Sequence, residues 1–252
     1  MNNSLLLAAA LIVVGSAPAS LAQDVTLIAP TAMRCALTHL APDVETKTGH
    51  ALKPTTGVGG AMRQRVIHGD AFDVSVVQAP IEDVVASGNV VAGSQTTLAT
   101  VSVALLMRKG SPKPDISTPE TLKQTLLAAK SITYGGAAGP AGGAAAAFDD
   151  VLKKLGIYDE MQGKVKHVPG SAPLKVLTDG VADYAVLFTS EADDPGVEVA
   201  GTIPESLTPP ARMVGFVSTH ASSAEAAQAV LKFLASADAA PAYQACEMQV
   251  AH

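Results

Sequence analysis

The 252-residue chain contains no tryptophan and is poor in aromatic and charged residues, at 4% and 16% of the sequence. Basic residues are the scarcer charged kind: 17 Lys and Arg stand against 23 Asp and Glu, a formal net charge of −6 at pH 7. A chain of this charge has no basic field for a phosphate backbone or an anionic lipid, so nucleic-acid and membrane-surface partners are disfavoured. Hydrophobic residues make up 48%, which is enough to bury a core.

Cysteine is also scarce, since only Cys35 and Cys246 occur, near opposite ends of the chain. In an oxidising compartment such a pair can form a disulfide. Two small buried apolar side chains explain the pair equally well, because a disulfide needs a Cα separation below about 7 Å that a sequence does not give. Both interpretations stay open. No Cys/His spacing resembles a metal site, and we expect neither a metal nor a cofactor.

The first 22 residues have the features of a secretory signal. Residues 5–14 form an apolar run that is too short for a bilayer, which takes about 20 residues. Small residues at Ser20 and Ala22 suit cleavage before Gln23. We therefore expect a signal peptide at residues 1–22 and a mature protein in a bacterial periplasm.

After this segment, strand-like and helix-like patterns alternate. Residues 25–29 form an apolar strand, and Thr31 can cap the helix that follows. A glycine-rich turn through Gly59 and Gly60 opens a second helix, and residues 72–77 form the next strand. Further helix starts are expected at Thr118 and Ser223, and further strands at residues 131–134, 184–188 and 213–217. This alternation predicts an α/β protein with largely parallel strands.

In this order, the segments resemble the periplasmic molybdate-binding family of type II solute-binding proteins. The resemblance rests on residues 25–33, 59–63, 69–74, 139–143, 151–156 and 188–192. It implies a two-lobed periplasmic-binding-protein fold, with two mixed sheets flanked by helices and a hinge of two crossing strands, for which residues 101–107 and 213–217 are candidates. Lobe one would comprise residues 23–104 with 213–252, and lobe two residues 105–212.

The same resemblance implies a function. The protein would capture a small anion, either an oxyanion or an organic carboxylate, in the cleft between the lobes. Hinge closure would follow, and the closed form would dock, as a monomer, on an ABC permease in the inner membrane.

The expected binding residues lie where small-residue turns open helices, because the first N–H groups of a helix lack partners and its dipole adds positive charge. The ligand-binding candidates are Thr31, Ala32, Met33, Arg34, Gly59, Gly60, Ala61, Arg63, Gly142, Gly143, Gly170 and Phe188. Molybdate binders of the family use two serine hydroxyls and one tyrosine hydroxyl. At those positions this chain has Ala32, Gly59 and Phe188, which argues against molybdate itself.

Two arginines are candidates to replace the missing hydroxyls. Arg34 and Arg63 are expected in the first turns of the two lobe-one helices that open at the site. The helix dipole disfavours a cation at that position, whereas a cation there stabilises a bound anion. A guanidinium pairs with a planar carboxylate in bidentate fashion, so this arrangement favours a carboxylate ligand. The alternative is that both side chains extend into water.

A second hypothesis is an enzyme on the same scaffold, such as an isomerase that moves a proton on a small di- or tricarboxylic acid. It would need a base of tuned pKa in the cleft. The candidates are His68, His167, Tyr134 and Glu191, none of them within a recognisable catalytic motif, so no catalytic residue is assigned.

Overall fold

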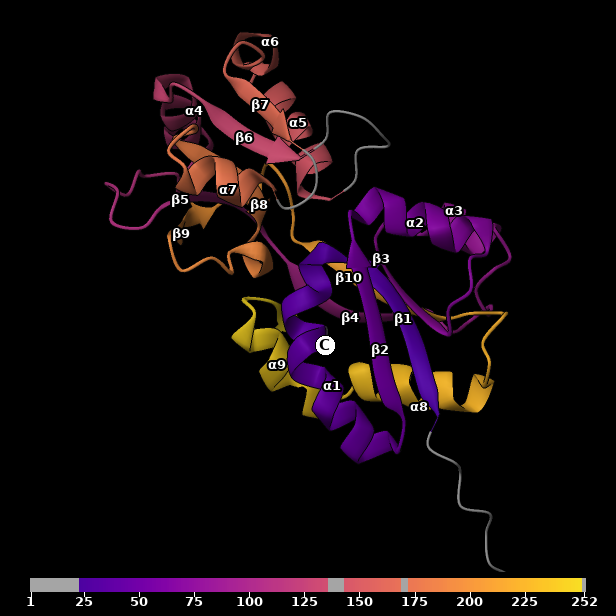
Figure 1. Cartoon of the computed structure of the whole chain (residues 1–252). Coiled ribbons are helices and arrows are strands. Elements are labelled where there is room, and N and C mark those ends of the chain that lie inside the picture. Colours follow the sequence, from indigo (N-terminus) through magenta and orange to yellow (C-terminus); the bar gives the residue numbers. More distant parts are fainter. Residues whose placement is uncertain (1–22, 136–142, 169–171, 251–252) are drawn as a thin grey trace, which may run out of the picture.

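The computed structural model describes residues 23–135, 143–168 and 172–250. Its strands form two mixed sheets, which Figure 1 shows in two lobes, one above the other. The expected architecture of two sheets flanked by helices is confirmed. Among the described residues, no helix combines the length and the apolar character needed to cross a membrane.

The lower lobe in Figure 1, lobe one, is built on a six-stranded sheet. Its strands, in spatial order, are β11 (Gln249–Val250), β4 (Thr96–Val101), β10 (Ala211–Val217), β3 (Val74–Gln78), β1 (Asp24–Pro30) and β2 (Ala51–Gly57). β2, β1 and β3 are parallel, and β10 is antiparallel to both β3 and β4. The carboxyl ends of three strands therefore meet at one edge of the sheet.

Helices cover both faces of this sheet because side chains alternate along each strand. On one face, Leu27 of β1 packs in a cluster with Leu40 and Val230. On the other face, Ile28 packs in a second cluster with Val66. The helices of the first face are α1 (Arg34–Thr48), α8 (Ala224–Leu234) and α9 (Ala240–Ala245), and those of the second are α2 (Gly59–His68) and α3 (Glu82–Ala86). Short 3-10 turns, η1 (Thr31–Met33) and η3 (Ala237–Ala239), precede α1 and α9.

Lobe two is built on a five-stranded sheet. Its strands, in spatial order, are β7 (Val165–Val168), β6 (Ile132–Gly135), β8 (Tyr184–Phe188), β5 (Val103–Arg108) and β9 (Val197–Thr202). Phe148 and Leu126 pack with Ile132 on one face, while Leu174 packs with Leu106 on the other. The helices are α4 (Pro119–Ala128), α5 (Ala144–Lys154), α6 (Tyr158–Met161) and α7 (Ala172–Thr178), with the 3-10 turn η2 (Thr189–Glu191) after β8.

The chain crosses between the sheets twice. Ser102 separates β4 of the first sheet from β5 of the second, so the expected crossing strand at residues 101–107 spans the change of sheet. The return runs through residues 203–210 between β9 and β10. Residues 213–217 lie wholly inside β10 of the first sheet, and the expectation that they form the crossing itself is wrong. The domain limits after residues 104 and 212 stay a prediction.

The helix starts are mostly as expected. Thr118 accepts a hydrogen bond from the Thr121 N–H in a capping box, and Ser223 accepts one from Ala226. Thr31 does not cap α1: it is the first residue of η1, and neither η1 nor α1 has a side-chain cap. Of the two open interpretations of the cysteines, the disulfide holds, because Cys35 and Cys246 are bonded with their Cα atoms 5.9 Å apart.

Candidate functional site

The edge where three parallel strands of lobe one end forms one wall of a cleft. Pro30 of β1 lies opposite Gly57 of β2, and a Cβ atom built on Gly59 would lie 3.6 Å from the Pro30 Cβ. Gln78 ends the neighbouring strand β3. Ligands of open α/β sheets bind at the carboxyl ends of strands, so this edge is the natural place for a site.

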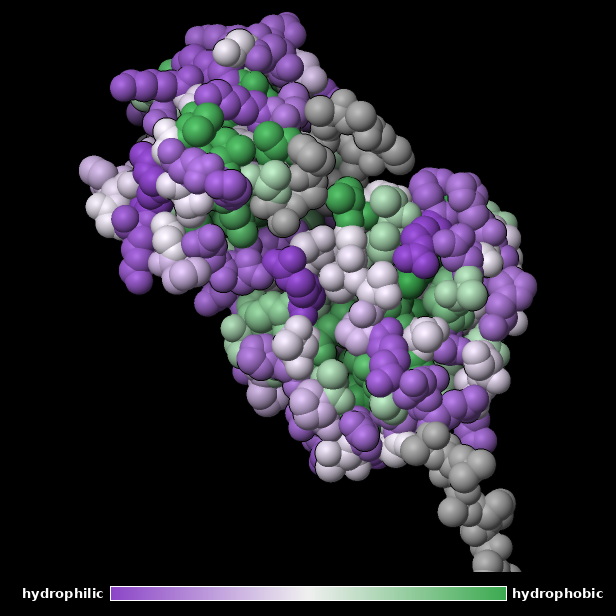
Figure 2. Space-filling model, in the orientation of Figure 1, coloured by the Kyte–Doolittle hydropathy of each residue, from purple (hydrophilic) through white to green (hydrophobic). Residues whose placement is uncertain are grey.

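Residues of both lobes enclose the cleft, which has a volume of about 530 Å³. A volume of this size is typical of small-molecule sites. Figure 2 shows the two lobes as separate masses joined at a narrower middle. The lining residues are Gly59, Gly60, Arg63, Gln64, Gln78, Ala79 and Pro80 from lobe one, and Gly143, Ala146, Ala147, Asp150, Lys154, Leu207, Thr208 and Pro209 from the rest of the chain.

Two helices begin at this cleft, α2 at Gly59 and α5 at Ala144. Neither has a side-chain cap, and neither carries an acid in its first turn. Of the other helices, α3, α4, α6 and α8 have an acid there, as the helix dipole prefers, whereas α1, α7 and α9 also lack one. The two cleft helices thus keep the positive ends of their dipoles uncompensated by acids of their own, and an anion between them would meet backbone N–H groups from both lobes.

Gly143, the N-cap of α5, has a backbone conformation that favours glycine, with φ at 73°. A Cβ atom at this position would lie 3.4 Å from the Phe188 ring and 3.8 Å from the Gln78 Oε1. Phe188 is buried at the end of β8, and the Gln78 side chain approaches Gly143 from lobe one. Gly143 and Gln78 therefore line the cleft from opposite lobes, whereas Phe188, an expected ligand-binding residue, packs behind Gly143 and is not part of the lining.

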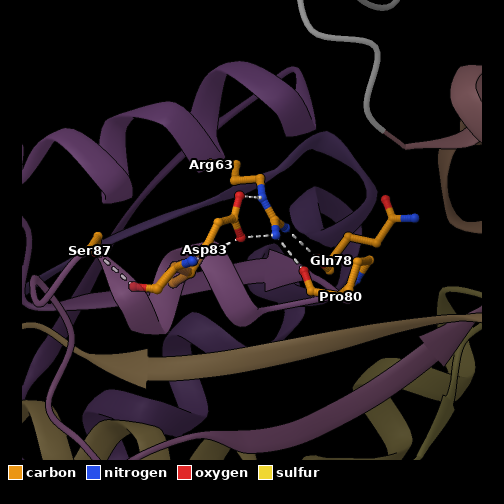
Figure 3. A network of polar contacts seen from close by, with 6 residues as sticks. Arg63, Gln78, Pro80, Asp83 and Ser87 are labelled. Carbon is orange, nitrogen blue, oxygen red and sulfur yellow. Dashed lines mark hydrogen bonds and ion pairs between the residues drawn. The ribbon is translucent and has the colours of Figure 1, made fainter.

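Arg63 lies on the cleft wall, but its guanidinium is bound within lobe one. Its Nε donates to an Asp83 Oδ2 at 2.9 Å and its Nη2 donates to the other carboxylate oxygen, which makes a bidentate pair. Nη1 donates to the Gln78 carbonyl at 2.8 Å, and Nη2 also donates to the Pro80 carbonyl. Figure 3 shows this fork, with the Gln78 amide extending away from it. Arg63 lowers the pKa of Asp83 through this pairing.

Arg34 pairs with Asp193, which follows η2 in lobe two. Both side chains are about two-fifths exposed, so the pair is at the surface. Arg34 is not among the residues that line the cleft. The hypothesis that both arginines pair with a ligand therefore receives no support from the cleft geometry, and the hypothesis that both extend freely into water is also wrong.

The remaining expected site residues divide into three groups. Gly59, Gly60 and Gly143 line the cleft. Ala32 and Met33 are buried in the lobe-one core, and neither they nor Thr31 and Ala61 line it. Gly142 and Gly170 lie outside the described residues.

The candidate bases lie away from the cleft lining. Burial and the Asp149 carboxylate raise the pKa of Tyr134, whose hydroxyl donates to Asp149 at 2.7 Å. His167 packs edge-on against the Tyr134 ring, and His68 is exposed at the far end of α2. Burial raises the pKa of Glu191, against the hydrogen bond from the Phe188 N–H and the charge of Arg34.

Several polar groups of the cleft were missed from sequence, namely Gln64, Gln78, Asp150, Lys154 and Thr208. Gln78 carried a signal, because it follows a buried apolar strand directly and strand ends bind ligands in this architecture. Lys154 donates to the Leu207 carbonyl, a contact across 53 residues that no local pattern indicates.

Two α/β lobes joined by two crossings, with helix N-termini opposed across a cleft, define a two-lobed solute-binding protein. Consistent with this class, residues 25–245 match the family model described as bacterial extracellular solute-binding protein, and the chain belongs to that family.

Two solved structures show the same architecture, and one further relative is similar in sequence. The periplasmic molybdate-binding protein of Azotobacter vinelandii is 17% identical, covers 90% of this chain and all of its own, and superposes with a TM-score of 0.75. Peb3, known from Campylobacter jejuni, has been solved with L-phospholactate bound; that structure is 17% identical, with a TM-score of 0.70 over 90% of this chain and all of its own. A Pseudomonas protein named aconitate isomerase is 29% identical over 249 residues, 94% of this chain and 93% of the relative.

Proposed function

We propose that the protein captures a small organic polycarboxylate in the cleft between its lobes. The observation that carries this proposal is the opposition of two helix N-termini, of α2 and α5, across the cleft. Gly59, Gly60 and Gly143 leave the backbone of both helices open to close approach by a ligand.

A carboxylate suits this cleft better than a bare tetrahedral oxyanion. The hydroxyls that molybdate binders use are absent at Ala32, Gly59 and Phe188, and a hydrogen bond to a charged group contributes about 1.5–3 kcal/mol. Gln64, Gln78 and Thr208 supply neutral donors spread along the cleft, which match several carboxylate groups on an extended molecule. The full-length Pseudomonas relative, whose name refers to a tricarboxylate, supports the same ligand class.

Delivery of the ligand to an ABC permease in the inner membrane completes the proposed function. Membership of the solute-binding family supports it, as do the two crossings around which the lobes can close. The protein would act in the periplasm as a monomer, after cleavage near Ala22. N-terminal sequencing of the exported protein tests the location: a chain that starts at or near Gln23 is expected, and a periplasmic chain that retains Met1 would contradict it.

The ligand class is tested by thermal unfolding with trans-aconitate, cis-aconitate, citrate, molybdate and sulfate at equal concentrations. A ligand at 100 times its Kd adds about 2.7 kcal/mol to the free energy of unfolding, which shifts the melting temperature measurably. We expect the shift with a polycarboxylate. A large shift with molybdate and none with any carboxylate would overturn the proposal.

Isomerisation of a tricarboxylate is the second candidate function, favoured by the Pseudomonas aconitate isomerase. It stands second because His68, Tyr134, His167 and Glu191 all lie outside the described cleft lining. Proton NMR of trans-aconitate incubated with the protein separates the two functions. Binding without formation of cis-aconitate supports capture alone, whereas conversion that disappears in a Gly143→Val variant supports catalysis in this cleft.

A further inference from the structure

The disulfide lies directly beneath the contact between the lobes. Cys35 is in the first turn of α1 and Cys246 follows α9, and Figure 1 shows these two helices side by side below the junction. The bond joins residues 211 positions apart in the sequence. Apart from it, the last described residues are held in the sheet by the two-residue strand β11, which pairs with β4.

The segment of lobe two that reaches this region is η2 with the residues just after it. The Ser190 hydroxyl donates to the Ala32 carbonyl at 2.8 Å, and the Thr189 hydroxyl donates to the Glu247 carbonyl at 2.9 Å. Asp193 pairs with Arg34. Ser190 and Thr189 are buried, and the bond from Ser190 is shielded from water, whereas the bond from Thr189 to the exposed Glu247 is partly buried.

All three lobe-one partners are neighbours of a bonded cysteine. Ala32 and Arg34 precede Cys35 by three residues and one residue, and Glu247 follows Cys246. Glu247 has φ at 55°, a left-handed conformation that a non-glycine residue keeps only where its surroundings enforce it. The disulfide thus fastens together the two chain segments on which η2 rests.

We propose that the Cys35–Cys246 disulfide is a redox-sensitive clamp on the contact between η2 and lobe one, and that its reduction weakens ligand capture in the cleft. The disulfide is coupled to the cleft through residues adjacent in the chain. Phe188 directly precedes η2 and packs beside Gly143, which lines the cleft. When the clamp opens, η2 no longer holds the lobes in one relative position, so a smaller fraction of molecules is competent to bind. The effect on ligand rests on the proposed function, but the loosening of η2 does not.

A water-soluble phosphine provides the test. It breaks the S–S bond, each sulfur becomes a thiol, and the phosphine is oxidised to its oxide with oxygen from water. Hydrogen exchange of the 188–193 peptide, followed by mass spectrometry without ligand, is expected to accelerate by about fivefold or more on reduction. The Cys35→Ser/Cys246→Ser variant should show the same acceleration.

Two control variants separate a clamp from general destabilisation. Val230→Ala removes buried side-chain volume on α8 and should leave exchange at 188–193 unchanged. Thr189→Val removes the hydrogen bond to Glu247, so it should accelerate exchange of this peptide in the oxidised protein. The further acceleration on reduction should then be smaller than in the wild type. If reduction leaves this peptide as protected as before, or accelerates it no more than Val230→Ala does, the clamp is disproved.

The same samples are then titrated with trans-aconitate. We expect about three- to tenfold weaker binding after reduction. Failure of both oxidised and reduced protein to bind trans-aconitate would count against the proposed function and leave the exchange result to decide the clamp. Equal affinity in both states, with faster exchange, would overturn the link to ligand capture.

Discussion

The two walls of the cleft are built differently. In lobe one, the Arg63 side chain ties α2 to Asp83 and to two carbonyls, of Gln78 at the end of β3 and of Pro80 just after it. In lobe two, the start of α5 presents only small residues, its N-cap Gly143 with Ala146 and Ala147, and the charged residues Asp150 and Lys154 line the cleft further along the helix. The lobe-one wall is thus held by side-chain hydrogen bonds, whereas the lobe-two wall has small residues at the helix start, where a ligand can approach the backbone.

The two walls are therefore expected to contribute to ligand binding in different ways. The lobe-one wall has a fixed shape before any ligand arrives, because four of the five Arg63 N–H groups have protein partners. The lobe-two wall contributes mainly the N-terminus of α5, which comes into play as the lobes close. Substitutions should therefore act through stability in lobe one and through close approach in lobe two.

The largest expected effect lies in lobe one. The Cys35→Ser/Cys246→Ser variant should lose about 2–5 kcal/mol of unfolding free energy, because the bond closes a long loop in the unfolded chain. Urea unfolding of the variant and of the oxidised wild type measures the loss. Reduced wild-type protein is the matched control and should behave as the variant does. Equal stability of all three would show that lobe one does not depend on its disulfide.

Arg63→Ala is expected to have the next largest effect, a loss of about 1–3 kcal/mol of unfolding free energy, since it removes a charged donor from two backbone carbonyls. The pair with Asp83 adds less, because that carboxylate is half exposed. Arg63→Lys is the control, since it keeps the charge but not the fork. If the lysine variant loses stability and binds trans-aconitate normally, Arg63 shapes the wall. If affinity alone falls in the alanine variant, Arg63 contacts the ligand after all.

The partners of Arg63 could not be predicted from the sequence. A cation in the first turn of a helix is unfavourable to that helix, so the sequence pattern allowed either a bound anion or a solvated side chain at Arg63. In the structure α2 begins at Gly59, so Arg63 lies in the second turn of the helix, and the expected placement in the first turn is wrong. The actual partner, Asp83, lies 20 residues away on another helix, and the carbonyls that Arg63 binds lie at and just after the end of β3. Only the tertiary arrangement brings these groups together.

The fold was more predictable than the site. The buried strand β8 is predominantly apolar, β1 ends in an apolar run, and α4 and α8 have caps that local patterns reveal. Strand β2 was missed because it lies at the sheet edge, has three consecutive exposed residues and contains Pro54. The glycine turns at Gly59 and Gly143 were found at the cleft, since small residues that open helices are a local signal.

Paired glycine substitutions test the lobe-two wall. Gly143→Ala should cost about 1–3 kcal/mol, because φ of 73° with ψ of −149° is a backbone conformation that alanine rarely adopts. Gly59→Ala should cost much less, as its Cβ would make an ordinary contact with Pro30. Trans-aconitate should bind more weakly to the Gly143 variant, measured by calorimetry. Equal losses at the two glycines would mean that the walls do not differ in this respect.

The smallest expected effects are opposite pH dependences in the two lobes. Burial alone would raise the pKa of Asp73 in lobe one, but hydrogen bonds from Thr26 and from the Ser222 N–H outweigh burial and lower it. A lowered pKa means that the ionised carboxylate stabilises the fold. This contribution is present above the ordinary value of 3.8 and is lost as pH falls below it.

Glu191 in lobe two has the opposite sign, because burial raises its pKa above the ordinary value of 4.5. Its contribution is present below 4.5 and is lost as pH rises through the raised value. We expect the stability advantage of wild type over Asp73→Asn to shrink with acid, and that over Glu191→Gln to shrink with base, each by at most about 1.4 kcal/mol per pH unit. Urea unfolding between about pH 3 and pH 7 measures both differences. Parallel pH profiles for the two variants would contradict the assignment of opposite signs. Crossing profiles would show that the fold holds the Asp73 carboxylate ionised and keeps the Glu191 carboxyl protonated to higher pH than usual.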